Sequence, residues 1–155
     1  MRTVSPEAFQ AALAALPENP RIVVSGNFAV PTDALALIDR ALPRYTIHAL
    51  NAGVGAAPDR DGVTAETCFV GAGMRKHRNL AYIPARLSLV PHLFRGPLPV
   101  DAVVVHVSPP RDGYVSMGIE CNILPAAIEA CRARSGRIFA VVNNHMPFTY
   151  GDALL

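Results

Sequence analysis

The stretch DAVVVHVSPPRDGYVSMG, residues 101–118, decides the fold class of this chain of 155 residues. Its first part, Ala102 to Val107, is an almost continuous apolar run, which is typical of a strand buried on both faces of a parallel sheet. A loop rich in proline and glycine follows at once. In an open α/β sheet, ligands bind at the carboxyl ends of such strands. The stretch therefore predicts a buried parallel strand with a ligand site beside it.

Further strands and helices alternate along the rest of the chain. Buried strands are expected at Ile22 to Ser25, Tyr45 to Leu50 and Arg137 to Val142, with a weaker pair around Thr67 to Val70 and Leu80 to Ile83. Helices are expected at Pro6 to Leu16, Thr32 to Leu42, Ala85 to Phe94 and Asn122 to Arg134. This alternation predicts an α/β fold with an open, mostly parallel sheet and helices on both faces. Residues 1–155 show no internal boundary and are expected to form a single domain.

Composition excludes several classes of function. The chain is 51% hydrophobic and 17% charged, and its formal net charge of +2 does not indicate a nucleic-acid partner. The one basic run, Arg75 to Arg78, is typical of a solvated loop, although it could touch a phosphate. No apolar run approaches the roughly 20 residues of a membrane span. The first helix is expected to be amphipathic and does not have the pattern of a signal peptide. The three cysteines lack CxxC spacing, which argues against a disulfide framework and a metal site; they are Cys68, Cys121 and Cys131. Together these features favour a cytoplasmic protein.

The loop after Val107 carries the densest concentration of special residues. Pro109 and Pro110 fix φ and lack amide donors, and Gly113 permits a left-handed turn. Tyr114 to Met117 can then return as a short strand. The polar groups left to face one crevice are those of Ser108, Ser116 and Gly118. On local features alone, a rigid proline turn that caps a hairpin is the simpler interpretation.

Two other loops also follow predicted strands and carry polar groups. Near the start of the chain, VSGNFAVPTDAL, residues 24–35, presents Ser25, Gly26 and Asn27 before a helix, where free amides can bind anions. It matches neither nucleotide-binding glycine motif, and an ordinary strand-to-helix turn is the alternative. Near the end, VVNNHMPFTYGD, residues 141–152, presents Asn143, Asn144 and His145. These could orient a carboxylate or thioester, or could simply be solvated.

Familiar hydrolase motifs are absent from the sequence. There is no GxSxG, no HExxH and no recognisable Cys-His signature. A carboxylate near a strand end can act as a nucleophile, and Glu120 is the only glutamate close to the proline turn. It is therefore the weak in-chain candidate for a catalytic residue, although turn formation and capping are the commoner roles of such acids.

Three stretches together resemble the acetyl-CoA hydrolase/transferase family, which includes 4-hydroxybutyrate and succinyl-CoA:acetate CoA-transferases. They are YIPARLSLVPHLF (82–94), DAVVVHVSPPRDGYVSMG (101–118) and AVVNNHMPFTYGD (140–152). The resemblance implies a CoA-transferase type of fold, with two such domains and an active site between them. In that family a glutamate carboxylate attacks an acyl-CoA thioester, and the glutamyl-CoA intermediate passes CoA to a second carboxylate or is hydrolysed. The family's glutamate lies in the second domain, beyond this sequence.

The resemblance carries a set of residues over to the first domain's wall of the cleft. It also implies that coenzyme A is a substrate and product, with a small carboxylate or water as acceptor and no permanently bound cofactor. Glu120 departs from the family pattern, which has a small or polar residue there. The residues carried over are Ser108, Pro109, Pro110, Gly113, Ser116, Gly118, Asn143, Met146 and Pro147.

We therefore expect the amino-terminal half of an acyl-CoA hydrolase or CoA-transferase, inactive alone. Its partner would be a second domain or subunit, in a homo- or hetero-oligomer, because the apolar residues at the end of the chain would otherwise stay uncovered. The alternative is a non-catalytic module of the same fold that binds acyl-CoA or a carboxylate. A sugar-phosphate isomerase of similar architecture is less favoured, because fold alone does not determine function.

Overall fold

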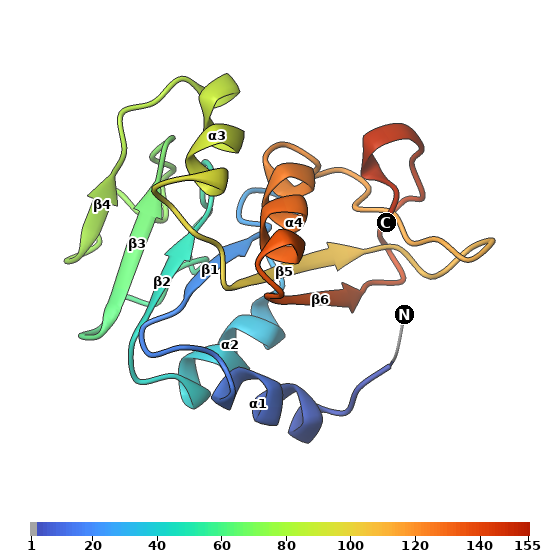
Figure 1. Ribbon diagram of the computed structural model, residues 1–155, viewed down its shortest axis with the longest axis horizontal. Helices are drawn as coiled ribbons and strands as arrows, with labels where there is room; N and C mark the ends of the chain where they lie inside the picture. The colour runs from blue at the N-terminus through green and yellow to red at the C-terminus, as the bar shows by residue number, and fades with distance from the viewer. Residues whose placement is uncertain (1–2) are drawn as a thin grey trace.

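The computed structural model describes residues 3–155, which form one open sheet of six strands that all run parallel. Across the sheet the strand order is β4-β3-β2-β1-β5-β6 (Figure 1). The predicted open α/β fold is confirmed. In chain order the strands are β1 (Arg21–Val24), β2 (Tyr45–His48), β3 (Val63–Thr67), β4 (Leu80–Tyr82), β5 (Ala102–Val107) and β6 (Arg137–Val142).

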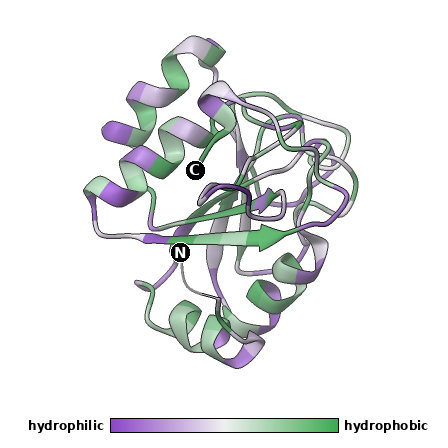
Figure 2. Cartoon of the chain, turned by 90° about the vertical axis from the view of Figure 1, so that its right-hand side faces the viewer, coloured by the Kyte–Doolittle hydropathy of each residue, from purple (hydrophilic) through white to green (hydrophobic). Residues whose placement is uncertain are grey.

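Helices cover both faces of this sheet, as predicted (Figure 1). On one face lie α1 (Pro6–Ala14) and α2 (Thr32–Ala41), and on the other lie α3 (Val90–Arg95) and α4 (Leu124–Ala133). Two short 3-10 helices, η1 (Leu87–Leu89) and η2 (Gly151–Ala153), complete the elements. Hydrophilic and hydrophobic segments alternate along the helices (Figure 2), so each turns an apolar side to the sheet. Within residues 3–155, no helix has the length and apolar character that crossing a membrane requires.

The central strands bury side chains on both faces, as their apolar runs predict. On β1, Ile22 and Val24 pack in the core under α1 and α2, whereas Val23 packs in the core under α3 and α4. This alternation follows from the two-residue period of a strand. The observed bounds of β1, β2, β4 and β5 differ from the predicted ones by two residues at most.

The predictions for β3, β6 and the third helix are wrong in part. β3 begins at Val63 and ends at Thr67, because its sequence VTAET alternates with polar residues and does not read as an apolar run. β6 has the predicted bounds but contains no buried residue, since it is an edge strand that pairs with β5 alone. The helix expected from Ala85 forms only as η1 and then α3, which Pro91 enters at its first turn.

The end of the chain is also different from expectation. Residues 114–117 form no continuous strand, but Val115 exchanges two backbone hydrogen bonds with Leu155, at 3.1 and 2.9 Å. The amide of Met117 donates to the carbonyl of Ala153 at 2.8 Å, and Ala153 is buried. The expectation that the apolar end of the chain stays uncovered is therefore wrong, because it packs as an extended segment against its own proline loop.

Two crossovers that leave the sheet centre in opposite directions create a switch point between β1 and β5. The chain passes from β1 through α2 to β2, and from β5 through α4 to β6, so these neighbouring strands send their loops to opposite faces. Such a point opens a crevice at the carboxyl ends of the strands. The loops after Val107 and Val142 emerge at one edge, as predicted, because these residues pair and the amide of Asn143 donates to the carbonyl of Val107 at 2.8 Å.

A buried ion network ties the first three strands together under α3. Glu66 on β3 accepts from the guanidinium of Arg21 on β1, at 2.9 and 3.1 Å, and from Nδ1 of His48 on β2, at 2.8 Å. His48 is fully buried, and its ring meets that of Phe94 edge-on at 5.1 Å. Burial works against ionisation of Glu66, but the hydrogen bonds from His48 and Arg21 hold its pKa below the usual value. The network therefore stabilises the fold with Glu66 ionised.

Replacing Glu66 with Gln tests this network. We expect a loss of about 3 kcal/mol in the free energy of unfolding at pH 7, because the variant leaves Arg21 and His48 without their anion. A lowered pKa adds stability above the usual value of 4.5, and this stability disappears as pH falls below it. Urea unfolding should therefore show the difference between the two proteins shrinking below pH 4.5. Glu129→Gln, which removes an exposed partner of Arg95, is the control and should cost under about 1 kcal/mol.

Candidate functional site

The loop after β1 curls its backbone around a single carboxylate. The amides of Gly26 and Asn27 donate to Oε1 of Glu120 at 2.8 and 3.0 Å. The amides of Phe28 and Ala29 donate to Oε2 at 3.1 and 2.9 Å. A side chain on Gly26 would collide with Ala49, so only glycine lets the loop approach β2 this closely. The amides of residues 26–29 thus form a concave group of donors of the kind that binds anions, which we call the cradle.

Glu120 reaches this cradle from the turn between β5 and α4, across the switch point. Its side chain is buried, and no Lys or Arg among residues 3–155 forms an ion pair with it. Burial lowers the pKa of His106, although Ala29, Asp33 and Glu120 oppose this, so His106 does not supply a positive charge at neutral pH. The carboxylate of Glu120 is therefore stabilised by backbone dipoles and by the side-chain amide of Asn122, at 3.3 Å.

A hollow of about 190 Å³ opens beside the cradle. Three carboxamides line it, and two of them are tied to Glu120: Asn27 through its backbone and Asn122 through its side chain. The third, Asn51, donates from Nδ2 to Oδ1 of Asn27 at 3.3 Å. The rest of the lining is apolar and consists of Leu50, Phe69 and Leu87.

This hollow joins loops that are distant in the sequence. Asn27 follows β1, Asn51 follows β2 and Phe69 follows β3, while Leu87 and Asn122 come from the segments after β4 and β5. Sequence reasoning identified Asn27 but missed Leu50, Asn51, Phe69, Leu87 and Asn122. The rule that ligands bind at the carboxyl ends of strands would have found Asn51 and Phe69, since each lies within three residues of a strand end.

The two serines of the proline loop are buried, and their hydroxyl groups already have hydrogen-bond partners within the protein. The hydroxyl of Ser108 donates to the carbonyl of Pro109 and accepts from the amide of Ser116, each at 3.0 Å. The hydroxyl of Ser116 donates to the carbonyl of Thr149 at 2.8 Å and accepts from the amide of Gly118 at 3.0 Å. Both serines are less than 1% exposed. In this structure Ser108 closes the loop on itself, and Ser116 links the loop to Thr149 near the end of the chain.

The remaining predicted residues fall into a packed group and an exposed turn. Gly118, at φ +60°, packs so closely on Met146 and Pro147 that a side chain there would collide with both. Asn143 caps its own turn, because its Oδ1 accepts from the amide of His145 at 2.9 Å. The residues of the exposed turn are Pro109, Pro110 and Gly113. The structure thus places Gly26 and Asn27 with Glu120, whereas the hydroxyl of Ser25 accepts from the amide of His106 on β5 at 3.3 Å. The predicted residues after β5 and β6 form a neighbouring cluster.

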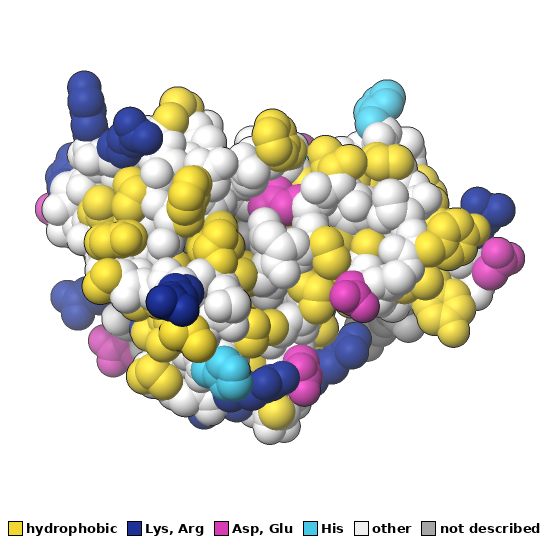
Figure 3. Space-filling view, turned by 90° about the horizontal axis from the view of Figure 1, so that it is seen from above, with side chains coloured by type: hydrophobic (Ala, Val, Ile, Leu, Met, Phe, Trp, Pro, Cys, Tyr) yellow, Lys and Arg dark blue, Asp and Glu magenta, His cyan; other side chains and the backbone are white. Residues whose placement is uncertain are grey.

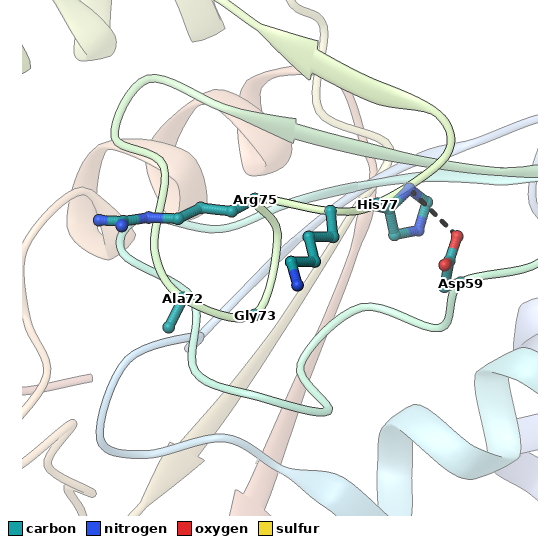
Figure 4. A pocket seen from close by; sticks show the side chains of 6 residues that line it. Asp59, Ala72, Gly73, Arg75 and His77 are labelled. Atoms are coloured by element: carbon teal, nitrogen blue, oxygen red, sulfur yellow. Dashed lines mark ion pairs between the residues drawn. The ribbon is translucent and has the colours of Figure 1, made fainter.

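A second hollow, of about 260 Å³, lies beside the basic run (Figure 4). His77 is buried, donates from Nε2 to the carbonyl of Pro58 and accepts at Nδ1 from the amide of Asn79. Figure 4 shows the side chain of Arg75 extending away from His77 and Asp59. Because both ring nitrogens of His77 already have partners within the protein, His77 has no free donor for a phosphate in this hollow.

The face around the site carries several exposed apolar side chains. Phe28 in the cradle loop is 78% exposed, and Ile119, next to Glu120, is 58% exposed. Phe69 and Leu87, which line the first hollow, are each about half exposed. Viewed from above, hydrophobic side chains spread over the face, while most Lys and Arg side chains lie near its outline (Figure 3). Apolar surface of this kind is typical of a region that meets another protein or a ligand.

Comparison with solved structures places the fold. The chain is similar to RipA from Yersinia pestis, with a TM-score of 0.79 and 18% sequence identity over 98% of this chain and 42% of that one. It is also similar to a point mutant of RipA, with a TM-score of 0.81 and 19% identity over 98% of this chain and 38% of that one. No protein-family model and no curated protein matches the sequence. The chain therefore shares the fold of RipA and spans about two fifths of the structures that it matches.

The cradle predicts an unusual response to small anions. Glu120→Ala should lower the free energy of unfolding by about 3 kcal/mol, because buried amides lose their acceptor. Sodium formate should then stabilise this variant more than sodium chloride does at equal ionic strength, since formate can occupy the vacated cradle. Urea unfolding measures both effects.

Two controls sharpen this test. Glu120→Gln keeps the shape of the side chain, so formate should not stabilise it beyond the effect of chloride. The exposed Glu129→Ala should behave like the unaltered protein. An equal response of all four proteins to formate would contradict the account of Glu120 as an anion held by backbone amides.

Proposed function

We propose that this chain is the amino-terminal half of an acyl-CoA hydrolase or CoA-transferase and forms one wall of the acyl-CoA and carboxylate cleft. The observation that carries the proposal is the gathering of the loops after β1, β2, β3 and β5 around one small hollow at the switch point. The CoA-transferase-like fold supports it. So does the sequence resemblance of residues 82–94, 101–118 and 140–152 to acetyl-CoA hydrolases and transferases.

In this proposal the chain binds and orients while another domain reacts. Coenzyme A enters as the thioester and leaves as product, a small carboxylate or water is the acceptor, and no cofactor stays bound. The nucleophilic glutamate belongs to a second domain or a partner subunit. Glu120 is not assigned that role, because both of its oxygens already accept hydrogen bonds from the loop after β1. A carboxylate held in this way has little freedom to attack a thioester.

The exposed apolar residues give the second domain a place to dock. Phe28 and Ile119 flank the cradle from the loops after β1 and β5, so a domain that covers them would also close the hollow from above. Closing it would exclude water from the thioester and strengthen every polar interaction inside. This accounts for the expected homo- or hetero-oligomer.

Binding without turnover is the expected behaviour of the chain alone. Acetyl-CoA added to the ¹⁵N-labelled chain should shift the amide signals of Asn27, Asn51 and Asn122. Neither hydrolysis nor transfer of CoA to a different carboxylate, propionate, should be measurable, because the nucleophile is absent. Robust turnover would contradict the proposal, and Glu120→Gln would then show whether this carboxylate is responsible. Signals that stay unchanged along the whole carboxyl edge of the sheet would contradict it as well.

A further inference from the structure

We propose that the hollow selects a short acyl group with an uncharged tail and rejects an acyl group that ends in a second carboxylate. This rests on the proposed function, because it assigns the hollow to the acyl part of the thioester. A volume of about 190 Å³ is smaller than the pockets that hold drug-sized ligands. It suits an acyl group of a few carbon atoms.

The lining of the hollow contains no charged side chain. Leu50, Phe69 and Leu87 offer apolar contact, and the polar groups are the carboxamides of three asparagines. An ionised carboxylate is costly to desolvate unless a cation or several donors receive it. No lysine, arginine or histidine lines the hollow, so a second carboxylate would find no positive partner there.

Hydrogen bonding within the lining points the same way. Nδ2 of Asn51 is used by Oδ1 of Asn27, Nδ2 of Asn122 by Glu120, and Oδ1 of Asn122 by the amide of Ile123. Within residues 3–155, Nδ2 of Asn27 and Oδ1 of Asn51 have no hydrogen-bond partner. Each carboxamide NH2 carries two N–H groups, so the lining keeps N–H donors as well as the carbonyl Oδ1 of Asn51, and a hydroxyl group on the acyl tail can use both kinds. A carboxylate only accepts, so it would leave Oδ1 of Asn51 without a donor.

The charge of Glu120 reinforces the selection. Its carboxylate lies directly behind the hollow, one hydrogen bond away from Asn122 and bonded to the backbone of Asn27. A second anion in the hollow would face this charge at close range in a partly desolvated site, where like charges repel strongly. Glu120 therefore has two consequences for the hollow: it holds two of its three carboxamides in place, and it disfavours an anionic occupant.

Two small amides that share an acyl-like carbonyl provide the test. Butyramide has an uncharged tail and succinamate ends in a carboxylate. In the ¹⁵N-labelled chain, butyramide should shift the side-chain amide signals of Asn27, Asn51 and Asn122. Succinamate should bind there at least about tenfold more weakly, because it meets no cation and faces Glu120.

A matched pair of variants tests the cause. Leu87 and Leu89 belong to the same short helix η1 and are about equally exposed, but only Leu87 lines the hollow. Leu87→Lys should raise the affinity for succinamate about tenfold by adding a cation. Leu89→Lys should leave the preference for butyramide unchanged.

Three results would overturn the proposal: equal affinity for the two probes, no butyramide shift at the three asparagines, or succinamate binding that Arg86→Gln abolishes. The last would mean that Arg86, next to Leu87, reaches over the hollow. The acetyl-CoA titration separates this failure from a failure of the proposed function. If acetyl-CoA shifts the site residues while the probes bind equally, only the specificity is wrong.

Discussion

The carboxylate of Glu120, held by the backbone amides of residues 26–29, is the interaction on which the site depends. It joins the loop after β1 to the turn after β5, the two segments that part at the switch point of the sheet. The crossovers that follow β1 and β5 run over opposite faces of the sheet, and this contact holds their first loops together. Because the amides compensate the charge, a buried anion is tolerated without a salt bridge. This contact positions Asn27 and Asn122 in the lining of the hollow and places the negative charge of Glu120 behind it.

Two buried glutamates thus organise the sheet in different ways. Glu66 is held by side chains from β1 and β2, and it secures strands that already pair with one another. Glu120 is held mainly by backbone, and it secures loops. The first arrangement stabilises the scaffold, whereas the second shapes a surface that can receive a ligand. The proposed division of labour with a second domain fits this surface, because its hollow combines three carboxamides with three apolar side chains and exposed apolar residues flank it.

The sequence predicts the scaffold better than the site. β1, β2 and β5 are apolar runs, and burial on both faces produces such runs directly. The position of β3 is predicted wrongly because its polar residue Glu66 is buried with partners on other strands, and no local sequence pattern reveals those partners. The exposure of β6 depends on its place at the sheet edge, not on its composition. In the site, Glu120 and Asn27 are visible as polar loop residues, but their contact spans more than ninety positions, and the hollow needs five separate segments to meet.

Hydrogen exchange at the amides of Gly26, Asn27, Phe28 and Ala29 tests the central claim most directly. Loop amides normally exchange fast, because they open to solvent without unfolding of the core. We expect these four to exchange as slowly as the amides of β1 in the unaltered protein. In Glu120→Ala they should exchange much faster, while the amides of β5 stay protected. Fast exchange of the four amides in the unaltered protein would contradict the account.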